Sequence, residues 1–242
     1  MRDWWREVSG LVLPVACAGC GRPRTELCAR CGTALHGAPP RRVRPSPRPP
    51  GLPAVHAAAP YENAVRAVLL AHKERGVLGL AAPLGRALAA SVRAGTGQPG
   101  AAGPLLLVPV PSARSATAAR GHDPVRRIAR AAAGELRRTG TPARVLPVLR
   151  QTRAVADQSG LGARRRRANL DGALAAARGG ERLLAHGRVV LVDDLLTTGS
   201  TLAEAARAVA EALGAGRESA GRGVCAAAVV SASPSAFEIN RN

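Results

Sequence analysis

The fold class of this 242-residue chain is decided by thirteen residues, VVLVDDLLTTGST, at positions 189–201. The opening apolar run predicts a buried β-strand. Asp193 and Asp194 follow at its carboxyl end, and a turn of small polar residues then opens a helix. Amides and hydroxyls of such a turn converge at a helix N-terminus, where the helix dipole favours a phosphate monoester. The turn comprises Thr197, Thr198, Gly199, Ser200 and Thr201.

The two adjacent acids suit a different part of the same ligand. Carboxylates accept hydrogen bonds from vicinal hydroxyls, as on a ribose, or hold Mg²⁺ through water. Gly199 is expected to let the backbone approach the phosphate closely. Paired aspartates also occur in magnesium sites of phosphotransfer domains, and a threonine-rich turn can be a plain helix cap. Neither alternative explains the acids and the turn together, so a sugar phosphate is the predicted ligand.

The rest of the chain alternates predicted strands with predicted helices. This order favours an α/β fold with a mostly parallel, Rossmann-like sheet and helices on both faces. Ligands on such sheets bind at the carboxyl ends of the strands. The expected strands are 105–110, 144–149, 188–192 and 224–230, and the expected helices are 61–73, 78–93, 123–138 and 201–213. The stretch 94–103 reads as a loop, and 151–170 is polar and aperiodic.

Four cysteines, Cys17, Cys20, Cys28 and Cys31, follow the spacing C-x2-C-x7-C-x2-C, and a glycine follows each pair. Two such knuckles predict a tetrahedral four-sulfur site that suits Zn²⁺. An iron–sulfur cluster, disulfides and free thiols are the alternatives. Four thiolates leave no position for water, so the predicted metal is structural. Cys225, alone in an apolar strand, is expected to be a packed core thiol.

These features divide the chain into three predicted parts. Residues 1–38 form an N-terminal helix with the zinc module, 39–54 form a linker, and 55–242 form the main domain. The linker is rich in Pro and Arg and is expected to be extended and unable to pack into a core. No apolar run is long enough for a transmembrane span, and the N-terminus does not resemble a secretion signal, so a cytoplasmic protein is expected. The oligomeric state cannot be predicted from these features.

The formal net charge of +19 permits binding to nucleic acid or another polyanion. Lys73 is, however, the only lysine, which indicates a general preference for arginine in this chain. Aromatic residues, on which bases stack, make up only 2% of the chain. The charge therefore does not by itself define a nucleic-acid face.

Residues 189–201 resemble the phosphoribosyl pyrophosphate (PRPP) motif of type I phosphoribosyltransferases. The whole chain resembles the ComF family, competence-associated proteins that join an N-terminal zinc module to a phosphoribosyltransferase domain. The cysteine knuckles and the stretches 61–76, 108–124 and 158–169 carry the rest of the resemblance. The family's Arg-Gly-Phe-Asn-Gln reads Arg-Gly-His-Asp-Pro at residues 120–124. Here His122 could be a proton donor or a structural residue, and Asp123 could be a helix cap.

The resemblance implies a role for each site residue. Asp193 and Asp194 would contact the ribose hydroxyls at the catalytic centre, and the turn 197–201 would hold the 5-phosphate. A loop from Ser112 to Arg120 and Gly121 resembles the pyrophosphate loop, and Lys73 is expected near pyrophosphate. Segment 150–169 corresponds to a flexible hood. Its candidate contacts are Arg153, Gln158, Arg166 and Asn169.

Two functions follow from this resemblance. The first is a magnesium-dependent transfer of phosphoribosyl from PRPP to a nitrogen acceptor, or PRPP binding without turnover. The second is a non-catalytic accessory of DNA uptake, which would bind single-stranded DNA or 5-phosphates and act alongside a competence helicase.

Overall fold

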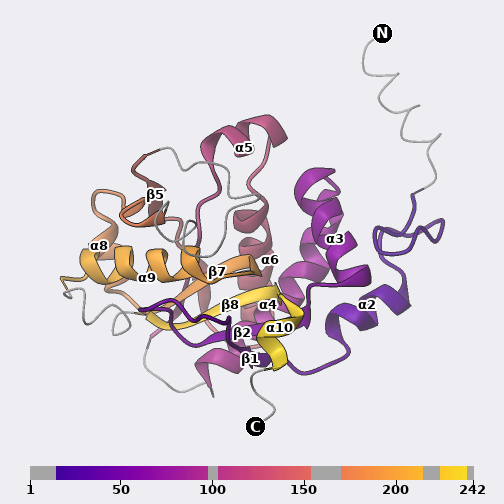
Figure 1. The fold of residues 1–242 in the computed structure, drawn as a ribbon, viewed down its shortest axis with the longest axis horizontal. Coiled ribbons are helices and arrows are strands. Elements are labelled where there is room, and N and C mark those ends of the chain that lie inside the picture. Colours follow the sequence, from indigo (N-terminus) through magenta and orange to yellow (C-terminus); the bar gives the residue numbers. More distant parts are fainter. Residues whose placement is uncertain (1–14, 98–102, 154–169, 215–223, 239–242) are drawn as a thin grey trace.

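The computed structural model describes residues 15–97, 103–153, 170–214 and 224–238. Within these ranges, six strands form one sheet in the order β1-β2-β8-β7-β3-β4 (Figure 1). The strands are β1 (Arg41–Val43), β2 (Val55–Pro60), β3 (Leu105–Pro109), β4 (Ala143–Val145), β7 (Arg188–Leu196) and β8 (Val224–Ala232). Only β1 pairs antiparallel to its neighbour. The predicted α/β fold with a mostly parallel sheet is confirmed.

Helices cover both faces of this sheet. One face packs against α3 (Asn63–Glu74), α4 (Ala81–Thr96) and α6 (Pro124–Arg138), with the short helix η1 (Leu78–Leu80) between α3 and α4. The other face packs against α9 (Ser200–Ala212) and α8 (Gly180–Leu184). Three more helices lie around this core: α2 (Ala29–His36), α5 (Arg114–Arg120) and α10 (Pro234–Glu238). None of the helices in the described ranges is long and apolar enough to cross a membrane.

The central strand β7 shows how the sequence builds two cores. Successive side chains of a strand point to opposite faces of the sheet. Val190 and Val192 accordingly belong to the cluster under α3, α4 and α6, whereas Val189 and Leu191 belong to the cluster under α9. Because both faces are covered, every residue from 189 to 192 is buried, and the strand reads as a continuous apolar run.

Two predictions about strands were wrong. The strand expected at 144–149 is interrupted at Pro147, which has no N–H to donate to a sheet. Its first part is β4, and its second part is β5 (Leu149–Gln151), which pairs with β6 (Leu174–Ala176) in a separate two-stranded sheet. Cys225 is exposed rather than packed in the core, because the pairing of β8 with β7 is irregular there: Val224 lies opposite Val189 and Ala226 opposite Val190, so Cys225 falls between the two pairs.

The Pro/Arg-rich segment 39–54 was expected to stay outside any core, and this interpretation was also wrong. Its residues Arg41–Val43 form β1, which pairs with β2. Val43 and Leu52 are each only 3% exposed and join the cluster beneath α9. The few apolar residues of the segment are therefore enough to fasten it to the sheet.

The cysteine-rich unit also shares the main core. Helix α2 buries Leu35, which is 1% exposed, in the same cluster as Leu80 and Leu84. Ala64 of α3 packs directly against the cysteines. The unit is thus attached to the helix that carries Lys73.

Candidate functional site

The two acids lie within β7, which continues to Leu196 and is longer than the predicted strand 188–192. As consecutive strand residues, their side chains leave on opposite faces of the sheet. Asp194 is 6% exposed and faces α3, while Asp193 is half-buried. The Asp193 carboxylate accepts a hydrogen bond of 2.8 Å from the backbone N–H of Asp194. The pair is therefore held rigidly, close to the point where the strand ends.

Lys73, in the last turn of α3, pairs with Asp194. Its Nζ lies 2.9 Å from Oδ2 of that carboxylate. Burial works against the charge on Lys73, but the negative charges of Asp194 and Asp193 outweigh it and raise the Lys73 pKa. The charge of Arg120 acts on Lys73 in the opposite sense, so the two cations lie near each other. The structure thus brings together four of the predicted site residues.

Asp193 is stabilised in its neutral form. Removal from water raises its pKa well above the usual range, and the charge of Asp194 adds to this effect. The ammonium of Lys73 and the N–H of Asp194 oppose the rise without cancelling it. The folded protein thus binds this proton more tightly than the unfolded chain does. Stability is therefore lost as the pH rises above about 3.9, the ordinary pKa of an aspartate.

We expect Asp193→Asn to stabilise the protein at pH 7, because asparagine cannot ionise and its side-chain oxygen can still accept the Asp194 N–H. An increase of about 2–4 °C in melting temperature corresponds to about 1 kcal/mol in a protein of this size. The increase should shrink as the pH falls towards about 4 and vanish below it, where Asp193 is neutral in both states. Thermal melts across this pH range test the expectation. Asp123→Asn is the matched control, since asparagine caps a helix as well as aspartate does. A lower melting temperature for Asp193→Asn at pH 7 would refute it.

The turn 197–201 connects β7 to α9. Gly199 is the N-cap of α9, with φ 76°, and α9 has no side-chain cap at this end. Thr198 donates a 3.1 Å hydrogen bond to the hydroxyl of Ser200. Thr197 is exposed, and Thr198 and Thr201 are half-buried. The turn thus offers hydroxyls and a helix N-terminus next to the acids.

The packing around position 199 gives a further reason for a glycine there, besides the expected approach to a phosphate. A Cβ at this position would lie 2.9 Å from Leu52 Cδ2 and 3.3 Å from Pro45 Cγ. The space that the missing side chain leaves is therefore filled by segment 45–52 and not left open to a ligand. Its positive φ is a second reason for glycine, since residues with a side chain are strained there.

The segment after β3 borders a cavity of about 520 Å³. Ser112 and Gly121, both predicted to contact pyrophosphate, line it together with Thr117 and Asp123. The expected loop contains a short helix, α5, which projects beyond the sheet in Figure 1 and ends at Gly121 in the left-handed conformation, φ 70°. Two of the predicted pyrophosphate residues are therefore at a cavity wall.

Arg120 does not line that cavity. Its guanidinium lies 3.4 Å from Glu74 of α3, and its Nε is buried with no hydrogen-bond partner among the described residues. Such a donor is costly to leave unpaired, so it could gain from a bound anion. The ion pair with Glu74 fixes Arg120 beside the Lys73 end of α3.

The two departures from the family pattern have structural roles. The Asp123 carboxylate caps α6, accepting a 3.0 Å hydrogen bond from the N–H of Arg126, which confirms the helix-cap interpretation. His122 lies between two backbone carbonyls, with Nδ1 3.1 Å from the oxygen of Arg120 and Nε2 3.2 Å from that of His72. These contacts favour the structural role for His122 over that of a proton donor.

The segment expected to form a hood, 150–169, is described only as far as Arg153. Arg153 is exposed, and its guanidinium donates a 3.1 Å hydrogen bond to the backbone oxygen of Asp171. The other three candidates, Gln158, Arg166 and Asn169, lie outside the described residues.

The four cysteines of the knuckles come together as predicted. Their sulfur atoms all lie within 4.8 Å of one another, and Cys20 is the exposed member. The N–H of Gly21 closes the first knuckle by bonding the Cys17 oxygen at 2.8 Å, and the N–H of Cys28 donates to Cys17 Sγ at 3.3 Å. The sulfurs of Cys20 and Cys28 are 3.6 Å apart, well beyond a disulfide bond. This group could hold a metal ion.

The cysteines of the cluster differ in how readily they lose a proton. Burial would raise the pKa of Cys17, but hydrogen bonds from the backbone of Cys28, Gly19 and Cys20 lower it to about 6. Burial, followed by hydrogen bonds to the other cysteines, raises the pKa of Cys31 to about 12. Four thiolates therefore do not form together without a compensating charge, which a divalent metal supplies.

Comparison with known proteins adds no further constraint. No protein family matches this chain, and neither does any individual curated protein.

Sequence reasoning missed two contacts at the site. Lys73 was expected near pyrophosphate, but its direct partner is Asp194. The ion pair between Arg120 and Glu74 was not anticipated. The usable signal for the first was the single lysine in an arginine-rich chain. Neither pairing could be derived from the spacing of residues in the sequence. Lys73 and Asp194 are 121 positions apart, and Arg120 and Glu74 are 46 positions apart.

Proposed function

We propose that this chain binds the phosphoribosyl group of PRPP, as a type I phosphoribosyltransferase-like protein of the ComF kind. Asp193 and Asp194 would receive the ribose hydroxyls. The turn 197–201 and the N-terminus of α9 would bind the 5-phosphate, and the segment from Ser112 to Gly121 would bind pyrophosphate.

One topological observation carries this proposal. Strands β7 and β3 are parallel neighbours, with Val192 opposite Pro109, the last residue of β3. The end of β7 with the turn that follows it, residues 193–201, and the segment 110–123 therefore extend beyond β3 at the same edge of the sheet, where ligands of such sheets bind. The acids, the hydroxyl-rich turn and the cavity beside Ser112 would correspond to the ribose, the 5-phosphate and the pyrophosphate of PRPP.

The residues at this edge also suit Mg²⁺, which would shield the pyrophosphate as it leaves the ribose. Mg²⁺ prefers oxygen ligands, keeps several waters and needs as few as one carboxylate beside the phosphates of a substrate. Asp194 already pairs with Lys73, so a magnesium ion would be held mainly by the phosphates and water. Lys73 and Arg120 would stabilise the charge of pyrophosphate, and the incoming nitrogen of an acceptor would take its place at the ribose.

We further propose that the four-cysteine group binds structural zinc. Four cysteine sulfurs in two knuckles are the preferred donor set of Zn²⁺. The group is closed by its own four ligands, which fits a structural role rather than a catalytic one.

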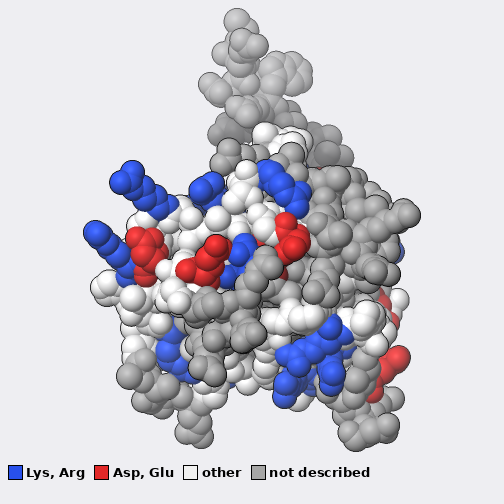
Figure 2. Space-filling model, turned by 60° about the vertical axis from the view of Figure 1, so that its left-hand side comes forward, with Lys and Arg blue, Asp and Glu red and all other residues white. Residues whose placement is uncertain are grey.

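The net charge of +19 favours a second candidate, a DNA-uptake accessory that binds single-stranded DNA. Figure 2 shows one face on which acidic and basic side chains alternate along a band, with a separate group of basic side chains below it. Single strands are bound by a continuous basic groove with exposed aromatic side chains. The mixed charges of this band and the scarcity of aromatics make this candidate the weaker one.

The dependence on salt and magnesium separates the two candidates. PRPP binding should disappear when Mg²⁺ is omitted and should change little with added potassium chloride. Binding of single-stranded DNA should instead weaken steeply, with a logarithmic slope of about −0.7 for each phosphate contacted. Fluorescence titrations with both ligands, with and without Mg²⁺, measure this. A steep salt dependence for DNA together with no PRPP binding would favour the accessory.

A further inference from the structure

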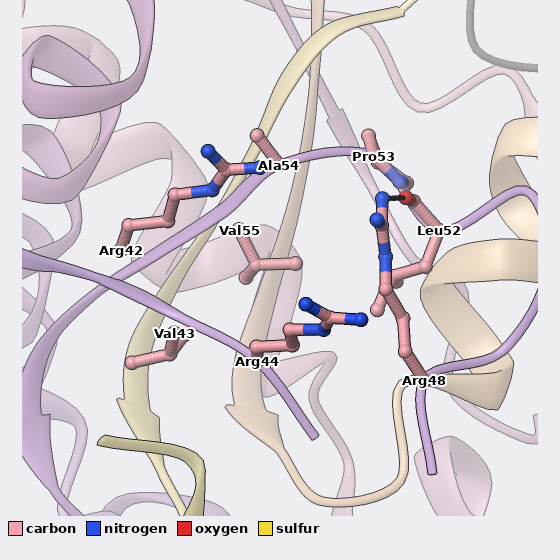
Figure 3. Close-up of a pocket in the computed structure, with 8 residues that line it drawn as sticks. All are labelled: Arg42, Val43, Arg44, Arg48, Leu52, Pro53, Ala54 and Val55. Carbon is pink, nitrogen blue, oxygen red and sulfur yellow. Dashed lines mark hydrogen bonds between the residues drawn. The ribbon is translucent and has the colours of Figure 1, made fainter. Parts of the chain in front are cut away.

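Two cavities whose walls include none of the residues 193–201 differ in their chemistry. Figure 3 shows the first, beside β1, where arginine and apolar side chains surround Val55. The second has a volume of about 310 Å³ and lies between the first cysteine knuckle, residues 16–21, and the end of α3. Of the two, only the second is lined by nucleophilic side chains, the thiols of Cys17 and Cys20.

The cluster presents one of its cysteines to solvent and covers the other three. Cys20 is exposed and borders the cavity. Cys17, Cys28 and Cys31 are 3%, 6% and 2% exposed. Gly19 lies directly against Cys31, since a Cβ at position 19 would be 2.7 Å from the Cys31 sulfur. A small reagent that arrives from solvent therefore meets Cys20 first.

Cations lie beside this exposed sulfur. Arg30, which is exposed on α2, forms a hydrogen bond with Cys20, and this bond together with the charges of the cysteines raises the pKa of Arg30. Arg75 also lines the cavity. A thiolate next to an arginine in a partly exposed place is the reactive kind of cysteine, whereas a buried cysteine is inert. The thiolate itself is ensured by metal binding, because a coordinating thiol is deprotonated.

A second sulfur lies within reach of Cys20. The Sγ atoms of Cys20 and Cys28 are 3.6 Å apart. An exposed thiolate close to a second cysteine is the usual arrangement of a redox-sensitive site. The two residues belong to different knuckles, so a bond between them would remove one ligand from each. Only Cys17 and Cys31 would remain, fewer than the four ligands of a structural zinc site.

We propose that Cys20 is a modification site for hydrogen peroxide, that Arg30 promotes its oxidation, and that Cys28 then forms a disulfide with it. The Cys20 thiolate attacks one oxygen of the peroxide, the O–O bond breaks, and hydroxide leaves, which gives a sulfenic acid. The Cys28 thiolate then attacks the Cys20 sulfur, the S–O bond breaks, and a second hydroxide leaves. Two thiolates thus lose two electrons, and one peroxide is reduced to two hydroxide ions. This inference rests on the proposed zinc binding and gives it a chemical control.

Substoichiometric oxidation tests which cysteines react. The full-length, zinc-loaded protein carries Cys225→Ser, because the exposed thiol of Cys225 would otherwise react as well. After treatment with hydrogen peroxide, free thiols are alkylated, disulfides are mapped by mass spectrometry, and a chromophoric chelator measures released zinc. Cys20 paired with Cys28 should be the main disulfide, and zinc release should match its amount. A first disulfide that lacks either residue, or an overoxidised Cys20 without a disulfide, would overturn the proposal.

Arg30→Gln tests the reactivity of Cys20 while all four cysteines remain. The variant should hold as much zinc as its parent, and peroxide should release this zinc several-fold more slowly. Arg130→Gln is the matched control, since Arg130 is exposed on α6 and its replacement removes the same charge elsewhere. It should react like the parent. Equal rates in all three proteins, or equal slowing in both variants, would contradict the role of Arg30.

The same measurements separate this inference from the proposed zinc site. If the purified protein holds no zinc, the zinc proposal fails, and a disulfide between Cys20 and Cys28 still supports the assigned pair. If zinc is present and stays bound while Cys20 is oxidised, the zinc proposal stands and the inference fails. Reduction of the disulfide with excess dithiothreitol, followed by removal of the reductant, should restore zinc binding.

Discussion

Replacement of Cys28 by serine is expected to abolish the proposed zinc binding and to lower the melting temperature by more than about 10 °C. Structural zinc contributes about 10–16 kcal/mol of apparent binding free energy in small metal modules. Here the cysteines pack against Ala64 of α3, and α2 buries Leu35 in the main core. Loss of the metal should therefore loosen α2 and α3 together and reach beyond the knuckles themselves.

Cys225→Ser provides the matched control for this experiment, because Cys225 is exposed and lies outside the cluster. For both variants, the metal content is measured by mass spectrometry and the melting temperature by circular dichroism. The wild type and Cys225→Ser should each contain about one zinc per chain. Identical melting of the two variants would contradict a structural metal. Iron with sulfide in place of zinc would keep the four-sulfur site but assign the alternative cluster.

The sequence was sufficient to predict those elements whose local residue pattern is explained by one kind of structure. The apolar run 189–192, buried on both faces, defined the central strand and with it the parallel sheet. The spacing of Cys17, Cys20, Cys28 and Cys31 predicted a cluster that the structure brings together. In both cases the local pattern contains all the information that is needed.

The errors arose where distant residues decide the outcome. Segment 39–54 has the composition of a linker, yet Val43 and Leu52 find a place beneath α9 that composition does not reveal. The contact of Gly199 with Leu52 and Pro45 was not predicted either, because it depends on that same packing. Pro147 differs from these cases, because its missing N–H was a local signal against a continuous strand.

The second large effect is expected on PRPP binding when the two proposed ribose contacts are replaced. Asp193→Asn/Asp194→Asn replaces both carboxyl groups at the end of β7 and removes the charge of Asp194. Hydrogen bonds to a charged group contribute about 1.5–3 kcal/mol, so the loss of this charge should weaken PRPP binding about 10-fold to 100-fold. The variant should stay folded, because each asparagine preserves the shape of the aspartate. Removal of two exposed charges elsewhere, by Glu181→Gln/Glu238→Gln, should have no effect.

Calorimetric titration of the zinc-loaded protein with PRPP, with and without Mg²⁺, tests the central claim most directly. The proposed site predicts magnesium-dependent binding in the wild type and in Glu181→Gln/Glu238→Gln, and its loss in Asp193→Asn/Asp194→Asn. A folded wild-type protein that binds no PRPP in the presence of Mg²⁺ would contradict a phosphoribosyl site at the end of β7.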